Sequence, residues 1–341
     1  MTRSNMSWKN EPFLLSPAGK DYLWGGDRLN LDFHKNIDLS PLAETWECST
    51  HPDGLSMVAS GPHKGLNLRR VLAEHPEYLG SHASATGAQT NNGSRELPVL
   101  VKLIDARQKL SVQVHPDDDY AGRYEQGSLG KSEMWYVLDA VPGAHLIYGF
   151  TRTMSESLVR QSLQQGDIEK YLRKVPVQKD DVFFVKAGTV HAIGAGILLA
   201  EVQENSNLTY RLYDFDRTDK NGLKRPLHID KALQVADLTG GANPRQPIRV
   251  LRYRPGYASE FLCRCKYFQV ERILINTSAD APCDCSTTEY SFRILLCPEG
   301  RGSLLFGSKI LSFDKGDCMF LPAASCPIGI CGNAVLLCIS C

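Results

Sequence analysis

Short apolar segments separated by turn-forming residues make up most of the chain. Apolar and β-branched residues gather in brief runs, and Gly, Pro, Asn or Asp stand between them. Clear examples are Leu97–Ile104, Ser111–His115, Met134–Leu138 and Asp181–Val185. Regular short strands with turn signals between them are typical of sandwiches and barrels. The pattern therefore predicts a mainly β protein.

Helical spacing of apolar residues is confined to a few segments. Two of them are short, Leu68–His75 and Leu227–Leu238. The clearest is Ser155–Val175, which opens on a Ser-Glu start signal and ends before Pro176. We therefore expect a small helical insertion at about 155–175. Residues 81–94 are rich in Ser, Ala, Gly, Thr and Asn, and they predict an exposed loop.

Two distant parts of the sequence resemble each other. Val177–His191 and Leu311–Ala324 both run as a Lys-x-Asp turn, a short apolar strand and a turn of small residues. The preceding segments, Met134–Phe150 and Arg293–Phe306, match more weakly as strand, turn and strand. This repetition predicts two copies of one jelly-roll half, of which only the first keeps its histidine, His191.

A natural linker separates the two copies. Residues 239–247 read Thr-Gly-Gly-Ala-Asn-Pro-Arg-Gln-Pro, a sequence that favours loop over strand or helix. We therefore expect a first domain over residues 1–242, which includes the helical segment, and a degenerate C-terminal β domain over residues 248–341.

Composition excludes some classes of partner. The chain has 341 residues and is 43% hydrophobic, which is enough for one large or two ordinary cores. Lys+Arg and Asp+Glu both count 38, and this balance argues against a nucleic-acid binder, which needs a surplus of cations. No apolar run approaches the roughly 20 residues of a membrane span. A small phosphorylated ligand, which needs only a local basic cluster, remains compatible.

The eleven cysteines do not predict a disulfide framework. Their number is odd, and no apolar leader segment follows Met1. Cys263-Arg-Cys265 and Cys283-Asp-Cys285 have CxC rather than the CxxC spacing of zinc ribbons. We expect small apolar core residues in a reducing cytosol, and hence a cytoplasmic protein.

Four polar residues form a candidate metal site. Gln113 and His115 are two apart on an expected strand, so both side chains point to one face. Glu133 begins the next strand, and His191 follows another. Two imidazoles and a carboxylate suit Zn²⁺ with one open position, and Gln113 would add a neutral oxygen. Each histidine alone is more typical of a structural residue. Their joint placement at matching strand ends indicates a metal centre in a β-barrel.

The segments around these residues form recognisable motifs. Near the site they are Gln113–Pro116, Gly130–Trp135 and Ala187–Ala192, and Glu201–Asp214 follows. The N-terminal motifs are Trp24–Gly26, Ala43–Trp46, Thr50–Gly54 and Leu97–Lys102. Together they resemble type I mannose-6-phosphate isomerase (phosphomannose isomerase), in its short bacterial branch. The C-terminal hundred residues resemble only a poorly preserved cupin domain. The resemblance implies cupin-type jelly-roll barrels, a bicupin, with a catalytic first domain.

The resemblance also implies an activity and roles for individual residues. Such enzymes interconvert mannose 6-phosphate and fructose 6-phosphate, with one zinc ion per chain. The family's zinc ligands correspond to Gln113, His115, Glu133 and His191, and its catalytic arginine to Arg211. We expect proton transfer through a cis-enediol, which zinc would assist as a Lewis acid.

The base that moves the proton has several candidates. Lys131 lies two residues before Glu133, so on a continuing strand it shares the metal-facing side. Glu201, on the strand after His191, and zinc-bound water compete for this role. A solvent-facing lysine at the strand edge is the structural alternative for Lys131.

Substrate contacts are expected at the same barrel mouth. Ser111 alternates correctly with Gln113, and Lys102 would act as a point charge on the phosphate, with Arg107 as a further candidate at the same mouth. Glu44 lies in a family motif and is a third candidate for substrate binding. Arg211 would orient a sugar oxygen or stabilise the enediolate; the structural alternative is an ion pair with Asp214 or Asp216.

Two other functions remain open at this stage. One is another metal-dependent cupin enzyme, such as an iron oxygenase, which favours two histidines and a carboxylate. The other is a catalytically inactive regulator that binds sugar phosphates. The protein partners of the chain are not predicted.

Overall fold

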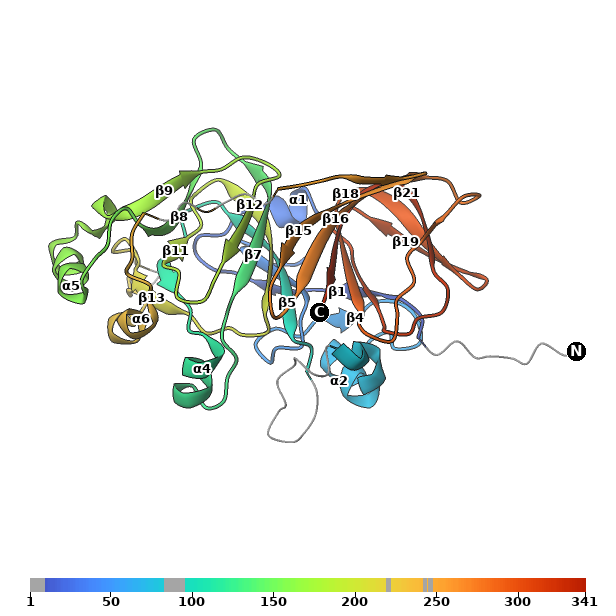
Figure 1. The fold of residues 1–341 in the computed structure, drawn as a ribbon, viewed down its shortest axis with the longest axis horizontal. Helices are drawn as coiled ribbons and strands as arrows, with labels where there is room; N and C mark the ends of the chain where they lie inside the picture. The colour runs from blue at the N-terminus through green and yellow to red at the C-terminus, as the bar shows by residue number, and fades with distance from the viewer. Residues whose placement is uncertain (1–9, 83–95, 219–221, 242–243, 245–247) are drawn as a thin grey trace, which may run out of the picture.

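Antiparallel strands dominate the computed structural model, which describes residues 10–82, 96–218, 222–241, 244 and 248–341. Figure 1 shows two groups of strands side by side, those of residues 97–213 on the left and those of residues 252–340 on the right. The mainly β class expected from the sequence is confirmed.

The first group contains a six-stranded sheet with all neighbours antiparallel. Its order is β10 (Val182–Val185), β7 (Glu133–Ala140), β12 (Ile197–Glu204), β5 (Val99–Ala106), β3 (Glu44–Cys48) and β2 (Ala18–Lys20). Every residue of the central strands β5 and β12 is buried. Side chains alternate between the two faces of a strand, so one face joins the main apolar core and the other faces the second sheet of this group.

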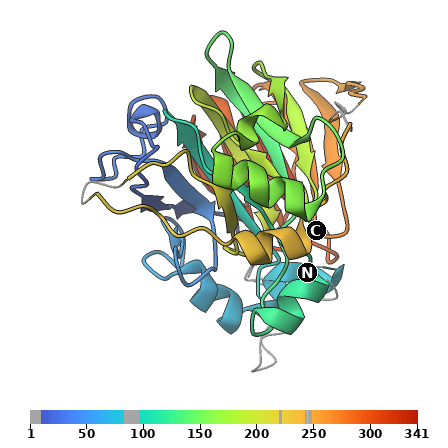
Figure 2. The same ribbon diagram turned by 90° about the vertical axis from the view of Figure 1, so that its left-hand side faces the viewer.

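A five-stranded sheet covers that inner face. Its order is β13 (Tyr210–Tyr213), β6 (Val112–Val114), β11 (His191–Ala192), β8 (His145–Phe150) and β9 (Leu172–Pro176). Apolar residues from both sheets form one cluster between them, which includes Ile104, Trp135 and Leu146. Helices α5 (Glu156–Gln165) and α6 (Ile229–Val235) cover the outer side, as Figure 2 shows in the foreground.

The second group forms a ten-stranded sheet that reaches back to the start of the chain. Its path is β14 (Arg252–Arg254), β15 (Tyr257–Arg264), β16 (Gln269–Thr277), β21 (Gly329–Ser340), β18 (Arg293–Phe306), β20 (Cys318–Leu321), β1 (Phe13–Ser16) and β4 (Met57–Val58). Beside this path, β17 (Cys283–Asp284) pairs with β21 and β19 (Lys309–Asp314) pairs with β18. The pairing of β1 with β20 ties the N-terminal residues to the C-terminal sheet. Most of the expected linker lies outside the described residues, and the division into two domains stays a prediction.

The two sheets share one strand order. The series β10-β7-β12-β5-β3-β2 corresponds position by position to β20-β18-β21-β16-β15-β14. One expected detail of the repeat is wrong, because Arg293–Phe306 is a single strand and not two strands joined by a turn. A register shift between Leu296 and Glu299 takes up the Pro-Glu-Gly segment as a bulge, so the strand continues through it.

All three segments expected to be helical contain a helix, but in one of them the helix is shorter than expected. Helix α2 (Leu68–Glu74) and α6 match two of the expected segments. In the third, α5 begins after the Ser155 cap and ends at Gly166, and the 3₁₀ helix η2 (Ile168–Lys170) follows. The end of this segment is a strand and not a helix, because β9 pairs with β8. Further helical turns that the apolar spacing did not predict include α1 (Arg28–Leu31), η1 (Pro76–Leu79) and α4 (Asp118–Tyr124).

The cysteines occupy the positions expected of small apolar core residues. All eleven thiols are free, and most are buried in the cores of the second group. In the described part of the chain, no helix combines the length and the apolar character needed to cross a membrane. Of the loop expected at 81–94, residues 83–94 lie outside the described residues.

Candidate active site

Three predicted ligands meet inside the first group of strands. His115 follows β6, Glu133 begins β7 and His191 begins β11. All three side chains are buried, and one ligand atom from each lies within 4.8 Å of the others. Strand pairing brings them together, since Glu133 faces Val185 at the end of β10 and His191 pairs with Gln113 on β6.

Backbone carbonyls orient both imidazoles. His115 Nδ1 lies 2.7 Å from the carbonyl oxygen of Leu208, and His191 Nδ1 lies 2.8 Å from that of Thr189. A carbonyl oxygen only accepts hydrogen bonds, so each Nδ1 carries the proton and each Nε2 presents a lone pair. These lone pairs face Glu133, at 3.2 Å from Oε1 for His115 and 3.8 Å from Oε2 for His191.

These groups suit a bound cation. Within the described ranges, His115 Nε2 and Glu133 Oε2 are buried without a hydrogen bond, while Glu133 Oε1 lies 2.9 Å from the ammonium nitrogen of Lys131. Burial and the nearby Lys131 lower the pKa of His115 to about 3, and burial lowers that of His191. Burial opposes ionisation of Glu133, but Lys131 and His115 outweigh it and hold its pKa well below the ordinary value. Two neutral imidazoles and an ionised carboxylate are the forms that bind a divalent metal.

The fourth predicted ligand, Gln113, lies beside this cluster. Its side chain is partly buried on β6, and its amide nitrogen is 3.4 Å from His191 Nε2. The amide group is therefore close enough to contribute its oxygen after rotation of the side-chain amide. Its role as a ligand stays a prediction.

A polar cavity of about 270 Å³ adjoins the cluster, since its lining includes Gln113, which lies against His191, and Lys131, which lies against Glu133. Gln113 lines it together with six predicted catalytic and substrate-binding residues, which are Glu44, Lys102, Ser111, Lys131, Glu201 and Arg211. The further candidate Arg107 is exposed and does not line this cavity. The sequence alone did not single out several other lining residues, which are Tyr22, Trp24, Ile104, Leu110, Ile193, Asn207, Thr209 and Arg225. The structure thus brings the predicted residues to one site, while their individual roles stay predictions.

A buried lysine joins two carboxylates on the cavity wall. Lys102 Nζ lies 3.3 Å from Glu201 Oε1 and 3.5 Å from Glu44 Oε2. Burial opposes the charge of Lys102, but Glu44 and Glu201 outweigh it and raise the pKa of its ammonium group. Burial and the Glu133 charge raise the pKa of Glu201. Lys102 is therefore a cation shared between two carboxylates before any substrate arrives.

Two buried tryptophans hold the same carboxylates from either side. Trp46 Nε1 donates to Glu44 Oε2 and Trp135 Nε1 donates to Glu201 Oε2, both at 2.8 Å. Strand register explains this arrangement, because Lys102 pairs with Trp46 on one side and with Glu201 on the other. Trp46 and Trp135 stood inside recognisable motifs, but nothing in their spacing identified them as hydrogen-bond donors to the site.

Arg211 reaches the cavity from β13 without a carboxylate partner among the described residues. Its Nε lies 3.3 Å from Ser111 Oγ, and its Nη1 donates to the Pro226 carbonyl at 3.0 Å. Asp214, the alternative partner considered from the sequence, instead pairs with Arg217 and Arg225. The Arg211 charge is therefore left to face the cavity.

Comparison with known proteins gives the family. The profile of the catalytic domain of type I phosphomannose isomerase matches residues 13–133. The chain is 38% identical to mannose-6-phosphate isomerase of Streptococcus mutans serotype c over 92% of both chains. It is 37% identical to a mannose-6-phosphate isomerase of Bacillus subtilis over 92% of this chain and 93% of the relative. The crystal structure of the mannose 6-phosphate isomerase from Bacillus subtilis superimposes with a TM-score of 0.85 at 34% identity, covering 96% of this chain and 99% of that one. The chain belongs to the type I mannose-6-phosphate isomerase family.

Proposed function

We propose that this chain interconverts mannose 6-phosphate and fructose 6-phosphate, as the names of its relatives indicate. The observation that carries the proposal is the buried cluster of His115, Glu133 and His191, which adjoins a polar cavity through Gln113 and Lys131. The catalytic and substrate-binding residues expected from the family motifs line the same cavity. A site for one metal, a small charged substrate and proton transfer is thereby assembled from one set of strands.

We propose zinc as the metal, held by His115, Glu133 and His191 with Gln113 as the fourth ligand. Two imidazoles and a carboxylate are a donor set common in catalytic zinc sites. When bound, zinc supplies Lewis-acid stabilisation of the negative charge that develops on a sugar oxygen during enolisation. Glu133 is the only charged residue of this set, so the centre keeps a net positive charge.

Two residues of the cavity are suited to move the proton between the neighbouring carbons. Lys131 Nζ lies 2.9 Å from Glu133 Oε1, and this contact holds its ammonium group beside the metal ligands. Glu201 is held through Oε2 by Trp135, while its Oε1 is buried next to Lys102. We propose that one of these two groups takes the proton and that the other fixes the geometry of the site.

Solvent exchange of the transferred hydrogen separates the two roles. Glu201→Gln and Lys131→Met variants are incubated with mannose 6-phosphate in deuterated water, and deuterium at carbon 2 is followed by NMR. Loss of the base stops both exchange and turnover, whereas loss of the positioning group slows both and leaves exchange detectable. Metal content and substrate affinity serve as controls for an intact site. Full exchange in both variants would exclude both residues as the base.

Arg211 and Ser111 form the proposed contact for anionic oxygens of the substrate. The guanidinium faces the cavity without a carboxylate partner among the described residues, and an arginine fork matches phosphate or enediolate oxygens well. Lys102 is already paired with Glu44 and Glu201, so we propose that this trio binds sugar hydroxyl groups more strongly than phosphate.

We also propose that the fold is a bicupin with one degenerate copy. The shared order of six strands in the two sheets supports this, as does the repeated Lys-x-Asp turn before β10 and β20. A cytoplasmic location remains a prediction from the cysteine pattern.

A coupled assay tests the proposed activity. Mannose 6-phosphate is supplied with and without a chelator, and formation of fructose 6-phosphate is followed. Turnover that disappears on chelation and returns with zinc supports the proposal, and His191→Ala removes both metal and turnover. Binding of sugar phosphate without turnover would favour an inactive regulator. Oxygen consumption that requires iron would favour a cupin oxygenase.

A further inference from the structure

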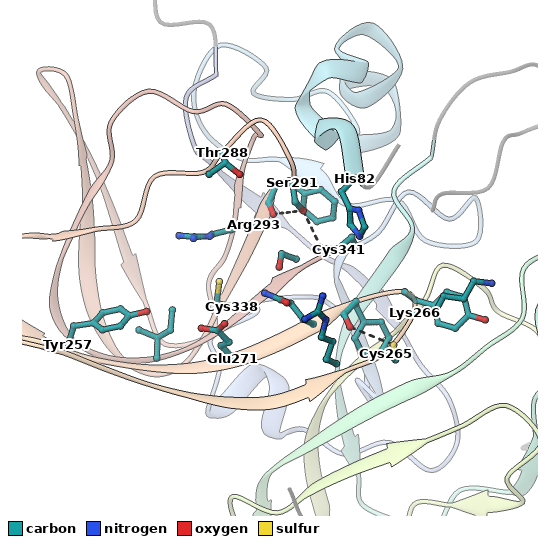
Figure 3. Close-up of a pocket in the computed structure, with 17 residues that line it drawn as sticks. His82, Tyr257, Cys265, Lys266, Glu271, Thr288, Ser291, Arg293, Cys338 and Cys341 are labelled. Carbon is teal, nitrogen blue, oxygen red and sulfur yellow. Dashed lines mark hydrogen bonds between the residues drawn. The ribbon is translucent and has the colours of Figure 1, made fainter. Parts of the chain in front are cut away.

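The second group of strands contains its own cavity, which the proposed reaction does not use. It measures about 310 Å³, compared with about 270 Å³ for the candidate active site. Figure 3 shows Tyr257, Arg293, Cys338 and Glu271 in one part of this cavity, and Cys265, Lys266 and His82 in another. The Tyr257 hydroxyl points toward the part that holds Cys338 and Glu271.

The strand register shows that this cavity occupies the position in the second sheet that corresponds to the candidate active site in the first sheet. Glu133 begins β7 opposite Val185, the last residue of β10, and Arg293 begins β18 opposite Leu321, the last residue of β20. Arg293 therefore occupies the position of Glu133, the predicted metal ligand.

The neighbouring wall positions correspond in the same way. Glu201 pairs with Lys102 on β5, and in the second sheet Cys338 pairs with Glu271 on β16. Glu271 thus stands where the first sheet has Lys102, and a thiol stands where it has Glu201. The second group of strands therefore has a cavity at the same position as the first, but the charged residues of its wall are different.

This exchange changes the kind of ligand that the cavity accepts. An arginine in place of Glu133 removes a metal ligand and adds a positive charge, which disfavours a cation. Among the lining residues that the structure describes, the charged side chains are Arg264, Lys266 and Arg293 against Glu271. The side chains of the lining therefore carry a surplus of positive charge.

The side chains identified in contact with Arg293 or near it are uncharged. It contacts the Cys285 thiol, and Cys338 and Tyr257 lie near it. Within the described ranges it makes no ion pair, whereas Arg272, two strands away on β16, pairs with Glu260 and Asp180. Partial burial of a guanidinium without an anionic partner costs free energy, because no negative charge compensates for the water that it has lost. A bound anion supplies that charge through charge-assisted hydrogen bonds.

We propose that this cavity is a second binding site, specific for a small anion that carries a phosphate group. Arg293 anchors the phosphate, and Glu271 and Tyr257 accept hydrogen bonds from the hydroxyl groups of a sugar when the phosphate carries one. The site lies in the C-terminal sheet, on strands that contribute no residue to the candidate active site. The proposal does not depend on the isomerase reaction.

Protection of cavity thiols provides a local test. Cys265 and Cys341 line the cavity and are partly exposed, so their alkylation rates report on its occupancy. The rates are measured by peptide mass spectrometry on the full-length protein in increasing inorganic phosphate or sorbitol 6-phosphate. Sorbitol is the uncharged control, and sorbitol 6-phosphate has no carbonyl group to isomerise. We expect both phosphates to slow alkylation in a saturable manner and sorbitol to have no effect.

Arg293→Met should raise the phosphate concentration needed for half-maximal protection about tenfold or more, because a charge-assisted hydrogen bond is lost. Arg252→Met is the matched control, since Arg252 is exposed on β14 and does not line this cavity. Glu271→Gln should keep protection by inorganic phosphate and weaken the advantage of sorbitol 6-phosphate.

The proposal fails if phosphate does not protect the wild-type thiols, or if Arg293→Met and Arg252→Met behave alike. Thermal unfolding establishes that Arg293→Met is folded. If it is not, Arg293→Lys decides the question, because it keeps the charge but loses the fork; unchanged half-maximal protection there would overturn the assignment of a guanidinium anchor. Isomerase turnover is measured separately, so loss of the proposed activity would leave this test intact.

Discussion

The hydrogen bond from Trp135 to Glu201 offers a sharp test of how the cavity works. Trp135→Phe keeps a buried aromatic ring and removes the Nε1 donor that lies 2.8 Å from Glu201 Oε2. A hydrogen bond to a charged group contributes about 1.5–3 kcal/mol. If the whole of this contribution stabilises the transition state relative to the bound substrate, its loss in Trp135→Phe lowers kcat roughly 10- to 100-fold. We expect this fall with KM changed only a few-fold, because Glu201 is a candidate for the proton-transfer step.

Trp46→Phe is the matched control. Trp46 is equally buried and donates to Glu44 across the same distance of 2.8 Å, but Glu44 is assigned to substrate binding. We therefore expect Trp46→Phe to raise KM more than it lowers kcat. Both variants lose one buried hydrogen bond and some ring volume, so their losses in unfolding free energy should be similar.

Steady-state kinetics of the coupled isomerase reaction and urea unfolding measure these effects. Metal content is measured in parallel, since the Trp135 ring also meets the His191 ring edge-on at 5.3 Å between centroids. The reasoning is refuted if Trp135→Phe retains wild-type kcat with full metal content. It is also refuted if the two variants change kcat and KM in the same proportions.

Three further predictions concern stability and the metal. Lys35 Nζ lies 2.7 Å from Glu47 Oε2, and the two side chains are 6% and 0% exposed. Lys35→Met should therefore lower the free energy of unfolding in urea by about 3–5 kcal/mol, because it leaves a buried carboxylate without its cation. A loss below about 1 kcal/mol would contradict this. Burial and the neighbouring Asp118 raise the pKa of Glu204 from 4.5 to about 8, so the folded state keeps a proton that the unfolded state has released. Wild-type stability should consequently fall as pH rises through this window, and the urea midpoint of Glu204→Gln should fall less between pH 6 and pH 9; parallel curves would refute the assignment. Chelation should abolish turnover and lower the midpoint of thermal unfolding, because the Glu133 carboxylate loses its bound cation. Added zinc should restore both turnover and the midpoint. Unaltered turnover after complete metal removal would disprove the metal mechanism.

Local patterns predicted much of the secondary structure. Alternation and turn residues identified the strands at Val99–Ala106, Val112–Val114 and Val182–Val185, because side-chain direction along a strand depends on sequence spacing alone. The same patterns failed at Leu172–Pro176, where amphipathic spacing predicted a helix. Pairing with β8 decides that segment, and hydrogen bonds to a distant strand leave no trace in local periodicity.

The sequence by itself determined which residues could bind a metal and which family motifs surround them. It also indicated the internal repeat, because a Lys-x-Asp turn can be recognised in the sequence of both copies. Only the tertiary structure decided that Lys102 is held between Glu44 and Glu201, and that Trp46 and Trp135 hold those carboxylates. These contacts depend on the register of neighbouring strands that are far apart in the chain, and a shift of one residue would turn the side chains to the opposite face. The same dependence on register places Arg293 at the position of Glu133, whereas the weak sequence match of Met134–Phe150 with Arg293–Phe306 is displaced from this correspondence by one residue.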